Sequence, residues 1–491
     1  MRSRKHEKQS VVSRAFLKIA IACLALTMYT SLIRGADVVV SLPSGIPSAM
    51  LLGLFENPGS TWMKNSGVPW NARYCYFTKG WVNNWGWGAY DGSWGLSFLR
   101  ECDSLHTVPA IQYYQINGEA GGGEAQFYLK TQNSTTMKSY FGDFKILMQR
   151  VKEFGKPVYM LLEADGFGYL QNQSGNNPNA PAAVASTGLA ELSGLPNTIA
   201  GWGLAFLAIK GSVGATNAIL GIHISGWASN QDLFYYSVSI PLQPEIDKVY
   251  DFLSPLGLVQ NVTGLTFNVL VGDPLDRDSD FYRLVNNDGG NHWWDTTASA
   301  SINSRSFNRY REWLRLWNVK SGKRWVLWQI PLGNSNHLNV NNTGNPREGY
   351  KDNRPEYFLG IGGMQHVQQC ADAGVIALLF GAGASGVSSY ENDFYTDGVL
   401  FMKSRGLAYF TAGGVPIKPD ASVRPLAGRA IGNSLGLHAD ACDVYDIRGR
   451  KIARLTAAGT TALGKVVPSG RYFVKMPGAK NPFLLPVMIV Q

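Results

Sequence analysis

The chain of 491 residues has few charged residues, few cysteines and few histidines for its length. Charged side chains make up 16% of it, and there are five cysteines and seven histidines. The cysteines form no Cys-x-x-Cys pair and the histidines no His-x-x-x-His pair, so the sequence predicts no metal site. The P-loop pattern that binds nucleotide phosphates is also missing.

The first 36 residues have the pattern of an export signal. Five basic residues lie among the first 14, and an apolar stretch follows over residues 15–28. Residues 1–36 are therefore predicted to be a signal peptide. An uncleaved membrane anchor is the alternative, because residues 15–33 are nearly long enough to span a bilayer.

Without this segment little net charge remains. It carries seven of the 44 basic residues and one of the 35 acidic ones, which leaves a net charge of +3. No Lys/Arg stripe is present, so no nucleic-acid partner is expected. Four cysteines remain, and in an exported chain Cys75 and Cys102 are the first pair to test for a disulfide. Free buried thiols are the alternative.

Short apolar runs alternate with segments of helical period along residues 37–412. A repeating strand–helix order favours parallel pairing with right-handed crossovers, so we predict a (β/α)8 TIM-like barrel, with an open doubly wound sheet as the alternative. An eighth strand is expected near residues 407–411 or 38–40. The seven visible strand candidates are residues 73–78, 108–114, 158–162, 218–224, 265–271, 324–330 and 375–380.

Three segments between these runs have a clear helical pattern. Residues 134–154 repeat apolar side chains at spacings of three and four, with Ser134 as a candidate cap and Gly155 at the end. Residues 303–319 and 355–373 repeat the design.

Beyond residue 412 the texture of the sequence changes. Residues 413–430 are rich in Gly and Pro and are predicted to be a linker, and residues 431–491 show short strand patterns of a small all-β domain. Asp443-Val-Tyr-Asp-Ile-Arg-Gly-Arg-Lys-Ile452, followed by Val467-Pro-Ser-Gly-Arg-Tyr-Phe-Val-Lys-Met476, resembles the C-terminal sorting domain of secreted Bacteroidetes and Fibrobacter proteins. The resemblance implies a type IX-like route, outer-membrane secretion machinery as a partner, and a secreted or outer-surface location.

A parallel barrel places its chemistry at the carboxyl ends of its strands. The apolar run 158–162 ends directly in Glu163 and Asp165. Glycoside hydrolysis needs one protonated and one ionised carboxyl group, and Asp273, Asp276, Asp278 and Glu391 follow other strands. We predict Glu163, Asp165 and Asp276 as the catalytic residues.

Aromatic and amide side chains share these strand ends. Sugars stack on aromatic rings and form hydrogen bonds with Asn, Gln and Asp, so a polysaccharide or oligosaccharide is the expected partner, with no cofactor and no metal. The predicted substrate-binding residues are Tyr113, Gln115, Tyr169, His223, Trp227, Asp273, Trp293, Gln329, Asn334 and Glu391.

Each of these residues also has a structural interpretation. Glu163 is then held by an arginine such as Arg277 or Arg354, and Asp165 caps a turn. The Asp-rich loop over residues 273–280 offers oxygen donors for calcium, although its spacing matches no EF-hand. His223 with Ser225 is then an ordinary hydrogen-bonded pair of the core.

A second resemblance concerns the barrel. Leu162-Glu-Ala-Asp165 is similar to a Glu-Pro-Asp motif of family 6 cellulases, and Asp276-Arg-Asp278 to an Asp-Arg-Asp motif of that family. The order is reversed and Ala164 replaces the proline, so the chain looks more like a secreted barrel family distantly akin to glycoside hydrolases. We predict a secreted glycoside hydrolase cleaving plant cell-wall polysaccharide (β-glucan-like). A non-catalytic polysaccharide-binding barrel at the cell surface is the alternative.

Overall fold

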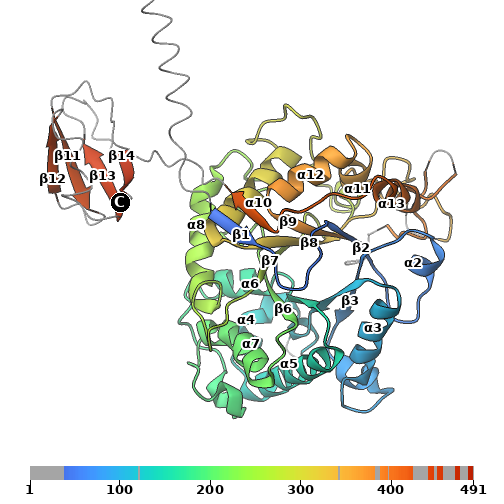
Figure 1. Ribbon diagram of the computed structural model, residues 1–491, viewed down its shortest axis with the longest axis horizontal. Helices are drawn as coiled ribbons and strands as arrows, with labels where there is room; N and C mark the ends of the chain where they lie inside the picture. Colours follow the sequence, from blue (N-terminus) through green and yellow to red (C-terminus); the bar gives the residue numbers. More distant parts are fainter. Residues whose placement is uncertain are drawn as a thin grey trace, which may run out of the picture. The chain divides into compact units, whose positions relative to one another are not determined.

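The computed structural model describes residues 38–119, 122–340, 343–381, 388–395 and 398–423, with four strands beyond residue 440 (Figure 1). Contacts divide the chain into a unit of Val39–Ala421 and a unit of Met1–Val38 with Ser422–Gln491. The predicted signal peptide lies outside the described residues. Among the described helices, none combines the length and apolar character that a membrane span needs.

Eight parallel strands close into a barrel, which confirms the predicted (β/α)8 architecture. Helices surround the barrel (Figure 1), and the closed ring excludes the doubly wound sheet. In order, the strands are β2 (Leu51–Phe55), β3 (Ala72–Phe77), β4 (Val108–Tyr113), β5 (Val158–Leu162), β6 (Ala218–His223), β7 (Val269–Gly272), β8 (Arg324–Ile330) and β9 (Val375–Phe380). A Gly-x-Gly-x-x-Gly spacing does follow β9 at Gly381. A closed barrel is not the fold in which that spacing binds dinucleotides.

The helices of the barrel unit vary from one turn to six. The longer ones contribute apolar faces that pack against the strands. They are α2 (Trp62–Asn65), α3 (Ser93–Ser104), α4 (Phe127–Thr131), α5 (Ser134–Phe154), α6 (Gly166–Gln173), α7 (Ile199–Val213), α8 (Leu242–Leu253), α9 (Ser279–Leu284), α10 (Phe307–Ser321), α11 (Arg354–Leu359), α12 (Met364–Asp372) and α13 (Phe401–Thr411).

The eighth strand is not where the sequence predicted it. Residues 407–411 belong to α13, and Val38–Ser41 forms β1, which pairs with β10 (Asp420–Val423) outside the barrel. The eighth strand is β2, whose short run is interrupted by Gly53. A Cβ at Gly53 would lie 2.4 Å from the Ala72 carbonyl oxygen, so close approach of β2 to β3 requires glycine there.

The predicted helices differ from the observed ones mainly at their ends. Helix α5 has the predicted bounds, but its cap is Asn133, whose side chain accepts a 2.9 Å hydrogen bond from the Thr136 N–H. Ser306 caps α10. The predicted helix over residues 355–373 is two helices, α11 and α12, because two glycines with positive φ, Gly362 and Gly363, interrupt it.

An aromatic layer fills the upper barrel interior below the carboxyl ends of the strands. Tyr74, Tyr76 and Trp328 contact one another edge to face, with ring centroids 5.7 to 6.2 Å apart, and the His223 ring lies 5.9 Å from Trp328. A register shift in β8 between Leu327 and Ile330 accompanies Gln329 at φ 50°. Such a bulge re-aims neighbouring side chains.

Arg324 ties the two ends of the barrel unit together at the opposite end of the barrel. Its guanidinium donates to the carbonyl oxygens of Val40 at 2.6 Å and of Lys418 at 2.8 Å. Val415 and Ile417 are buried. The first part of the predicted linker therefore packs against the barrel, and the barrel unit continues to Ala421 rather than ending at residue 412.

The second unit is described only as strands. The strands β11 (Ala441–Asp446), β12 (Lys451–Thr456), β13 (Gly470–Lys475) and β14 (Leu485–Ile489) pair antiparallel in the order β12-β11-β13-β14. The rest of the predicted linker, residues 424–430, lies outside the described residues, and the sorting domain stays a prediction.

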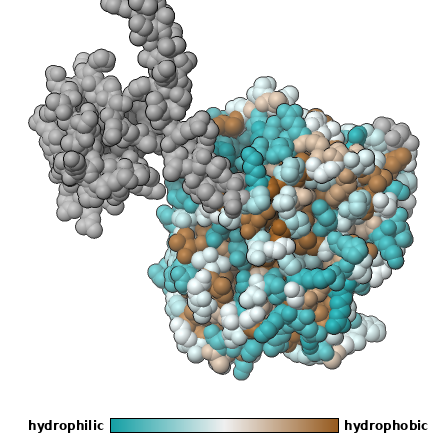
Figure 2. Space-filling view, viewed as in Figure 1, coloured by the Kyte–Doolittle hydropathy of each residue, from teal (hydrophilic) through white to brown (hydrophobic). Residues whose placement is uncertain are grey.

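Cysteines and surface complete the picture of the barrel unit. Cys75, Cys102 and Cys370 are buried free thiols, so Cys75 and Cys102 form no disulfide. On the face in Figure 2, hydrophilic and hydrophobic residues are interspersed.

Candidate active site at the carboxyl ends of the strands

The loops that follow β5, β6 and β7 enclose a pocket of about 280 Å³ at the carboxyl ends of the strands. Five of the sequence-predicted site residues line it: Asp165, Tyr169, Trp227, Asp273 and Asp276. The other lining residues are Ser225, Gly226, Asp232, Phe234, Tyr235, Leu275, Tyr282 and His292.

Asp165 lies at the position that precedes α6, but its side chain does not cap that helix. Its φ of 58° places it in the left-handed region, which costs a non-glycine residue about 1–3 kcal/mol. The carboxylate instead accepts a hydrogen bond from the Ser225 hydroxyl, and the Asp165 N–H donates to Nδ1 of His223 at 3.2 Å. The turn therefore directs the Asp165 carboxylate into the pocket.

His223, at the end of β6, lies between two carboxylates. Its Nδ1 is 4.0 Å from Asp165 Oδ1, and its Nε2 is 3.4 Å from Asp273 Oδ1. Because Nδ1 accepts the Asp165 N–H, the hydrogen-bond pattern places the ring proton of neutral His223 on Nε2, toward Asp273. Burial lowers the pKa of His223, but the Asp273 contact and the Asp165 charge outweigh it, so the pKa is raised.

Burial and charge set the protonation of Asp165. Desolvation raises its pKa to about 7, with a further contribution from the Asp273 charge, while His223 and the Ser225 hydroxyl act in the opposite direction. A carboxyl group with this pKa is partly protonated near neutral pH. Asp165 can therefore donate a proton where an ordinary aspartate cannot.

Asp276 is held by donors on one side of the pocket. The Tyr282 hydroxyl and the Arg277 guanidinium both donate to its carboxylate, and the Gln329 side-chain amide lies 3.4 Å from its carbonyl oxygen. Burial raises the pKa of Asp276, and the Tyr282 and Arg277 contacts oppose that change. Gln329 thus supports the loop rather than lining the pocket.

Aromatic rings form two walls of the pocket. On one side the Tyr169 and Trp227 rings lie 5.0 Å apart, and the Tyr169 hydroxyl donates to Glu124 at 2.8 Å. On the other side His292 stacks between Tyr282 and Tyr235, at 3.9 and 4.0 Å. Sugar rings can stack on such surfaces.

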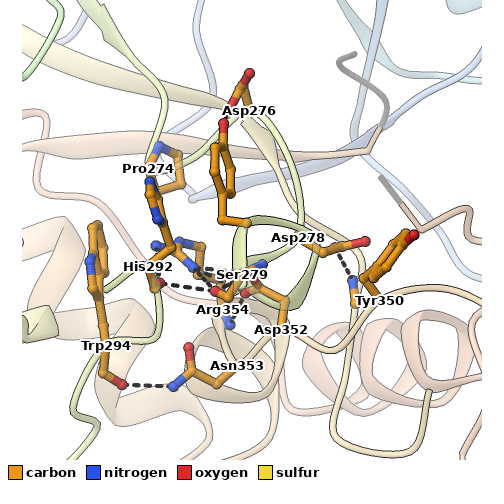
Figure 3. Close-up of polar contacts among 12 residues, drawn as sticks. Pro274, Asp276, Asp278, Ser279, His292, Trp294, Tyr350, Asp352, Asn353 and Arg354 are labelled. Atoms are coloured by element: carbon orange, nitrogen blue, oxygen red, sulfur yellow. Dashed lines mark hydrogen bonds and ion pairs between the residues drawn. The ribbon is translucent and has the colours of Figure 1, made fainter. Parts of the chain in front are cut away.

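A buried ionic cluster anchors the Asp-rich loop below the pocket (Figure 3). Arg354 donates to Asp352 at 3.0 Å and to the Ser279 hydroxyl at 2.8 Å, and its guanidinium lies 4.2 Å from the Trp294 ring centroid. Asp278 accepts from the Gly333 N–H at 2.9 Å. This carboxylate does not line the pocket, and the protein's own donors occupy it where the calcium interpretation needs free oxygens.

Glu163 lies apart from the pocket. It is fully buried at φ 42°, and its Oε1 accepts hydrogen bonds from the N–H groups of Gln115 at 3.1 Å and Ile116 at 3.3 Å. Burial raises the pKa of Glu163 to about 7. The structure therefore does not place Glu163 with Asp165 and Asp276. The predicted arginine contacts also differ, because Arg277 pairs with Asp276 and Arg354 with Asp352.

Two other predicted binding residues face the helices instead of the pocket. The Tyr113 hydroxyl donates to the Tyr140 carbonyl oxygen at 2.8 Å, and the Gln115 side chain donates to Asp143 at 2.8 Å. Both acceptors belong to α5. These residues fasten the end of β4 to that helix.

Three more predicted residues do not line the pocket. Asn334 is buried and donates to Asp393 at 2.6 Å. Trp293 is 38% exposed, and its neighbour Trp294 takes the buried position. Glu391 is exposed.

Sequence reasoning missed four pocket residues that come from long loops: Asp232, Tyr235, Tyr282 and His292. Asp232 and Tyr235 follow the pocket residue Trp227 in the loop after β6, and Tyr282 lies six residues beyond Asp276. The aromatic content of these two loops was the available signal. Nothing in the sequence shows that the loops fold back over the strand ends.

A divalent cation is the group most easily imagined in this pocket. Asp165, His223 and Asp273 each offer a ligand atom, and these atoms lie within 4.8 Å of one another. A zinc ion holds ligands at about 2.0–2.2 Å, which requires a tighter and convergent set. His223 turns its two nitrogens toward different carboxylates, so the donors do not fit a resident metal. That no metal is needed stays a prediction.

Comparisons with known proteins add the fold alone. No protein-family model and no curated protein matches the sequence. Among solved structures, a Cellulomonas fimi endo-beta-1,4-mannanase double mutant is 9% identical with a TM-score of 0.42, over 92% of this chain and 100% of that chain.

The catalytic domain of a Bacillus sp. JAMB-750 GH26 endo-beta-1,4-mannanase is 9% identical with a TM-score of 0.43, over 74% of this chain and 86% of that one. Xylanase B from Clostridium stercorarium F9 is 11% identical with a TM-score of 0.38, over 74% and 98%. Likenesses this low carry no argument about what this barrel binds or cleaves.

Proposed function

We propose that the protein is a glycoside hydrolase that cleaves plant cell-wall polysaccharide, with Asp165 and Asp273 as its two carboxyl groups. The observation that supports the proposal is the pairing of these residues at the barrel mouth, with ligand oxygens within 4.8 Å. Retaining enzymes hold their carboxyl groups about 5–5.5 Å apart, and inverting enzymes about 6.5–9.5 Å. The separation favours retention.

Asp165 is the acid in this mechanism. Its raised pKa of about 7 keeps a proton available for the glycosidic oxygen as the bond to the leaving sugar breaks. Asp273 is the nucleophile: its carboxylate forms the bond to the anomeric carbon. His223 lies against Asp273 and favours its ionised form. Water then attacks the glycosyl ester while Asp165 accepts the water proton, which restores both carboxyl groups.

Asp276 stabilises charge in this proposal. Its carboxylate is fixed by Tyr282 and Arg277 and faces the same pocket. The sequence had placed Asp276 as the catalytic partner and Asp273 as a binding residue. The His223 contact and the short separation from Asp165 exchange the two roles.

The test is the release of reducing sugar from barley β-glucan, glucomannan and xylan by three variants. Asp165→Asn and Asp273→Asn are each expected to lower turnover by about 10²–10⁴-fold, with folding unchanged by circular dichroism. Asp251→Asn, an exposed carboxylate on α8, is the matched control and keeps wild-type turnover.

Two results would count against the proposal. Wild-type turnover in both pocket variants would remove these carboxylates from the chemistry. Binding of the polymers by the wild-type chain without any release of sugar would favour the alternative function, a non-catalytic polysaccharide-binding barrel at the cell surface.

We also propose that the chain is exported and sorted to the cell exterior. The support is the signal-peptide pattern of residues 1–36 and the sorting-domain resemblance within residues 431–491. An extracellular location suits a polymer too large to enter a cell.

A further inference from the structure

Three aromatic side chains are exposed on the segment that joins β3 to α3. Trp87 is 89% exposed, Tyr90 59% and Trp85 46%. We call these three residues the tryptophan platform. Exposed aromatic surface of this extent is a feature of binding sites rather than of ordinary solvated loops.

The backbone of the platform is fixed in a costly conformation. Asn84 has φ 50° and Trp85 φ 51°, and a bulky residue in the left-handed region is an outlier. Hydrogen bonds hold the turn: the Trp85 N–H donates to Gly80 O at 2.8 Å and the Trp87 N–H to Asn84 O at 3.0 Å. Strain of this kind points to a role for the side chains that it presents.

Neighbouring elements support the platform from below. The Trp85 ring packs edge to face on Trp94 of α3 at 4.9 Å, and the Tyr90 hydroxyl donates to Asp143 of α5. Trp87 is thus displayed by a braced loop. A rigid aromatic surface loses little conformational entropy when a ligand stacks on it.

The chemistry of the segment specifies an uncharged ligand. Residues 81–90 contain no charged side chain, and Asn83 and Asn84 lie between the tryptophans. The nearest preceding cation, Lys79, pairs with Glu119. Aromatic faces beside amide groups suit a neutral sugar polymer, whereas an anionic polymer or a lipid headgroup would require basic residues.

We infer that the tryptophan platform is a second polysaccharide-binding site, separate from the pocket. The inference rests on the proposed function for the class of ligand. The segment leaves the carboxyl end of β3, the same end of the barrel from which the pocket loops arise (Figure 1). The platform holds a neutral chain against the enzyme while the pocket acts on a bond elsewhere.

The experiment is affinity electrophoresis of the full chain in native gels that contain glucomannan, hydroxyethylcellulose or arabinoxylan. All variants carry Asp165→Asn, so that hydrolysis does not remove the polymer. Trp87→Ala is expected to weaken retardation by about tenfold, Trp87→Phe to restore most of it, and Val259→Ala, an exposed apolar control, to leave it unchanged.

In the chain with an intact Asp165, Trp87→Ala is expected to slow the release of sugar from polymer while leaving the cleavage of a short oligosaccharide unchanged. Equal retardation of Trp87→Ala and its parent, or no retardation by any polymer, would overturn the inference. A dimer in solution that Trp87→Ala converts to a monomer would do the same, because the platform would then be a contact between two copies. Loss of oligosaccharide cleavage in Asp165→Asn tests the proposed function separately.

Discussion

At the scale of single residues, the Ser225 hydroxyl adjusts the proton affinity of Asp165. It donates to the ionised form of the carboxylate and so lowers the pKa that burial raises to about 7. In Ser225→Ala that donor is lost, and the pKa of Asp165 rises further. Since Asp165 must be protonated to act as the acid, the alkaline limb of kcat/KM is expected to move up by about one pH unit.

The measurement is the pH profile of kcat/KM, which reports the groups of the free enzyme. Ser212→Ala, an exposed serine of α7 that does not line the pocket, is the control. An alkaline limb that stays in place or moves down would assign it to another group.

Glu163 makes stability depend on pH. Its pKa is raised from 4.5 to about 7 by burial. Between these values the folded chain keeps a proton that the unfolded chain has released, so the contribution of Glu163 is complete below pH 4.5 and is lost as the pH rises through 7.

Glu163→Gln has no such proton to lose. Relative to the wild type, the variant is expected to gain about 3 kcal/mol in the free energy of unfolding between pH 4.5 and pH 8. Urea denaturation at a series of pH values measures the difference. A constant difference across the series would mean that Glu163 has an ordinary pKa.

The backbone explains why adjacent residues of one motif have different roles. Glu163 and Asp165 alternate in sequence, which predicts a common side for both in an extended strand. Both residues have positive φ, and the chain turns at each. Asp165 therefore faces the pocket while Glu163 holds the end of β4, and no sequence pattern reveals that turn.

At the scale of elements, strand parity decides which side chains face the barrel interior. In β4, Gln112 lies beside the inward-facing Tyr76 in register, and Tyr113 points to α5. The sequence predicted seven of the eight strands because their apolar runs are distinct. It did not give the parity at the strand ends, which the bulges and turns there reset.

Gly53 tests the closure of the barrel at β2. A Cβ there would lie 2.4 Å from the Ala72 carbonyl oxygen of β3, so Gly53→Ala is expected to destabilise the barrel by about 1–3 kcal/mol. Gly142→Ala in α5 is the matched change, because nothing lies within 4 Å of its added methyl group. That variant should gain up to about 1 kcal/mol.

Chemical denaturation of the two glycine variants measures both effects. If Gly53→Ala were as stable as Gly142→Ala, then β2 would have room to move away from β3, and the barrel would close less tightly than described.

At the scale of the whole molecule, the barrel unit and the strands β11 to β14 separate by their contacts. A chain that ends after Val423 keeps all of Val39–Ala421 and is expected to retain the hydrolysis and thermal unfolding of the full chain. It should lose delivery to the cell exterior, because the residues that resemble a sorting domain are gone.

Activity, melting temperature and the extracellular fraction, measured in a host with type IX-like secretion machinery, check this prediction. Normal export of the shortened chain would contradict the sorting role. A lowered melting temperature would instead show that the barrel depends on the residues that were removed.

The Arg324 contacts with Val40 and Lys418 have a topological consequence. One guanidinium binds the backbone near both ends of the barrel unit, and the Leu42 N–H donates to Pro419 O at 2.9 Å. The start and finish of this unit are therefore neighbours, and a short peptide would suffice to join them. The barrel is then nearly a circular chain, in which the order of the eight strand–helix units depends only on where the ring is opened.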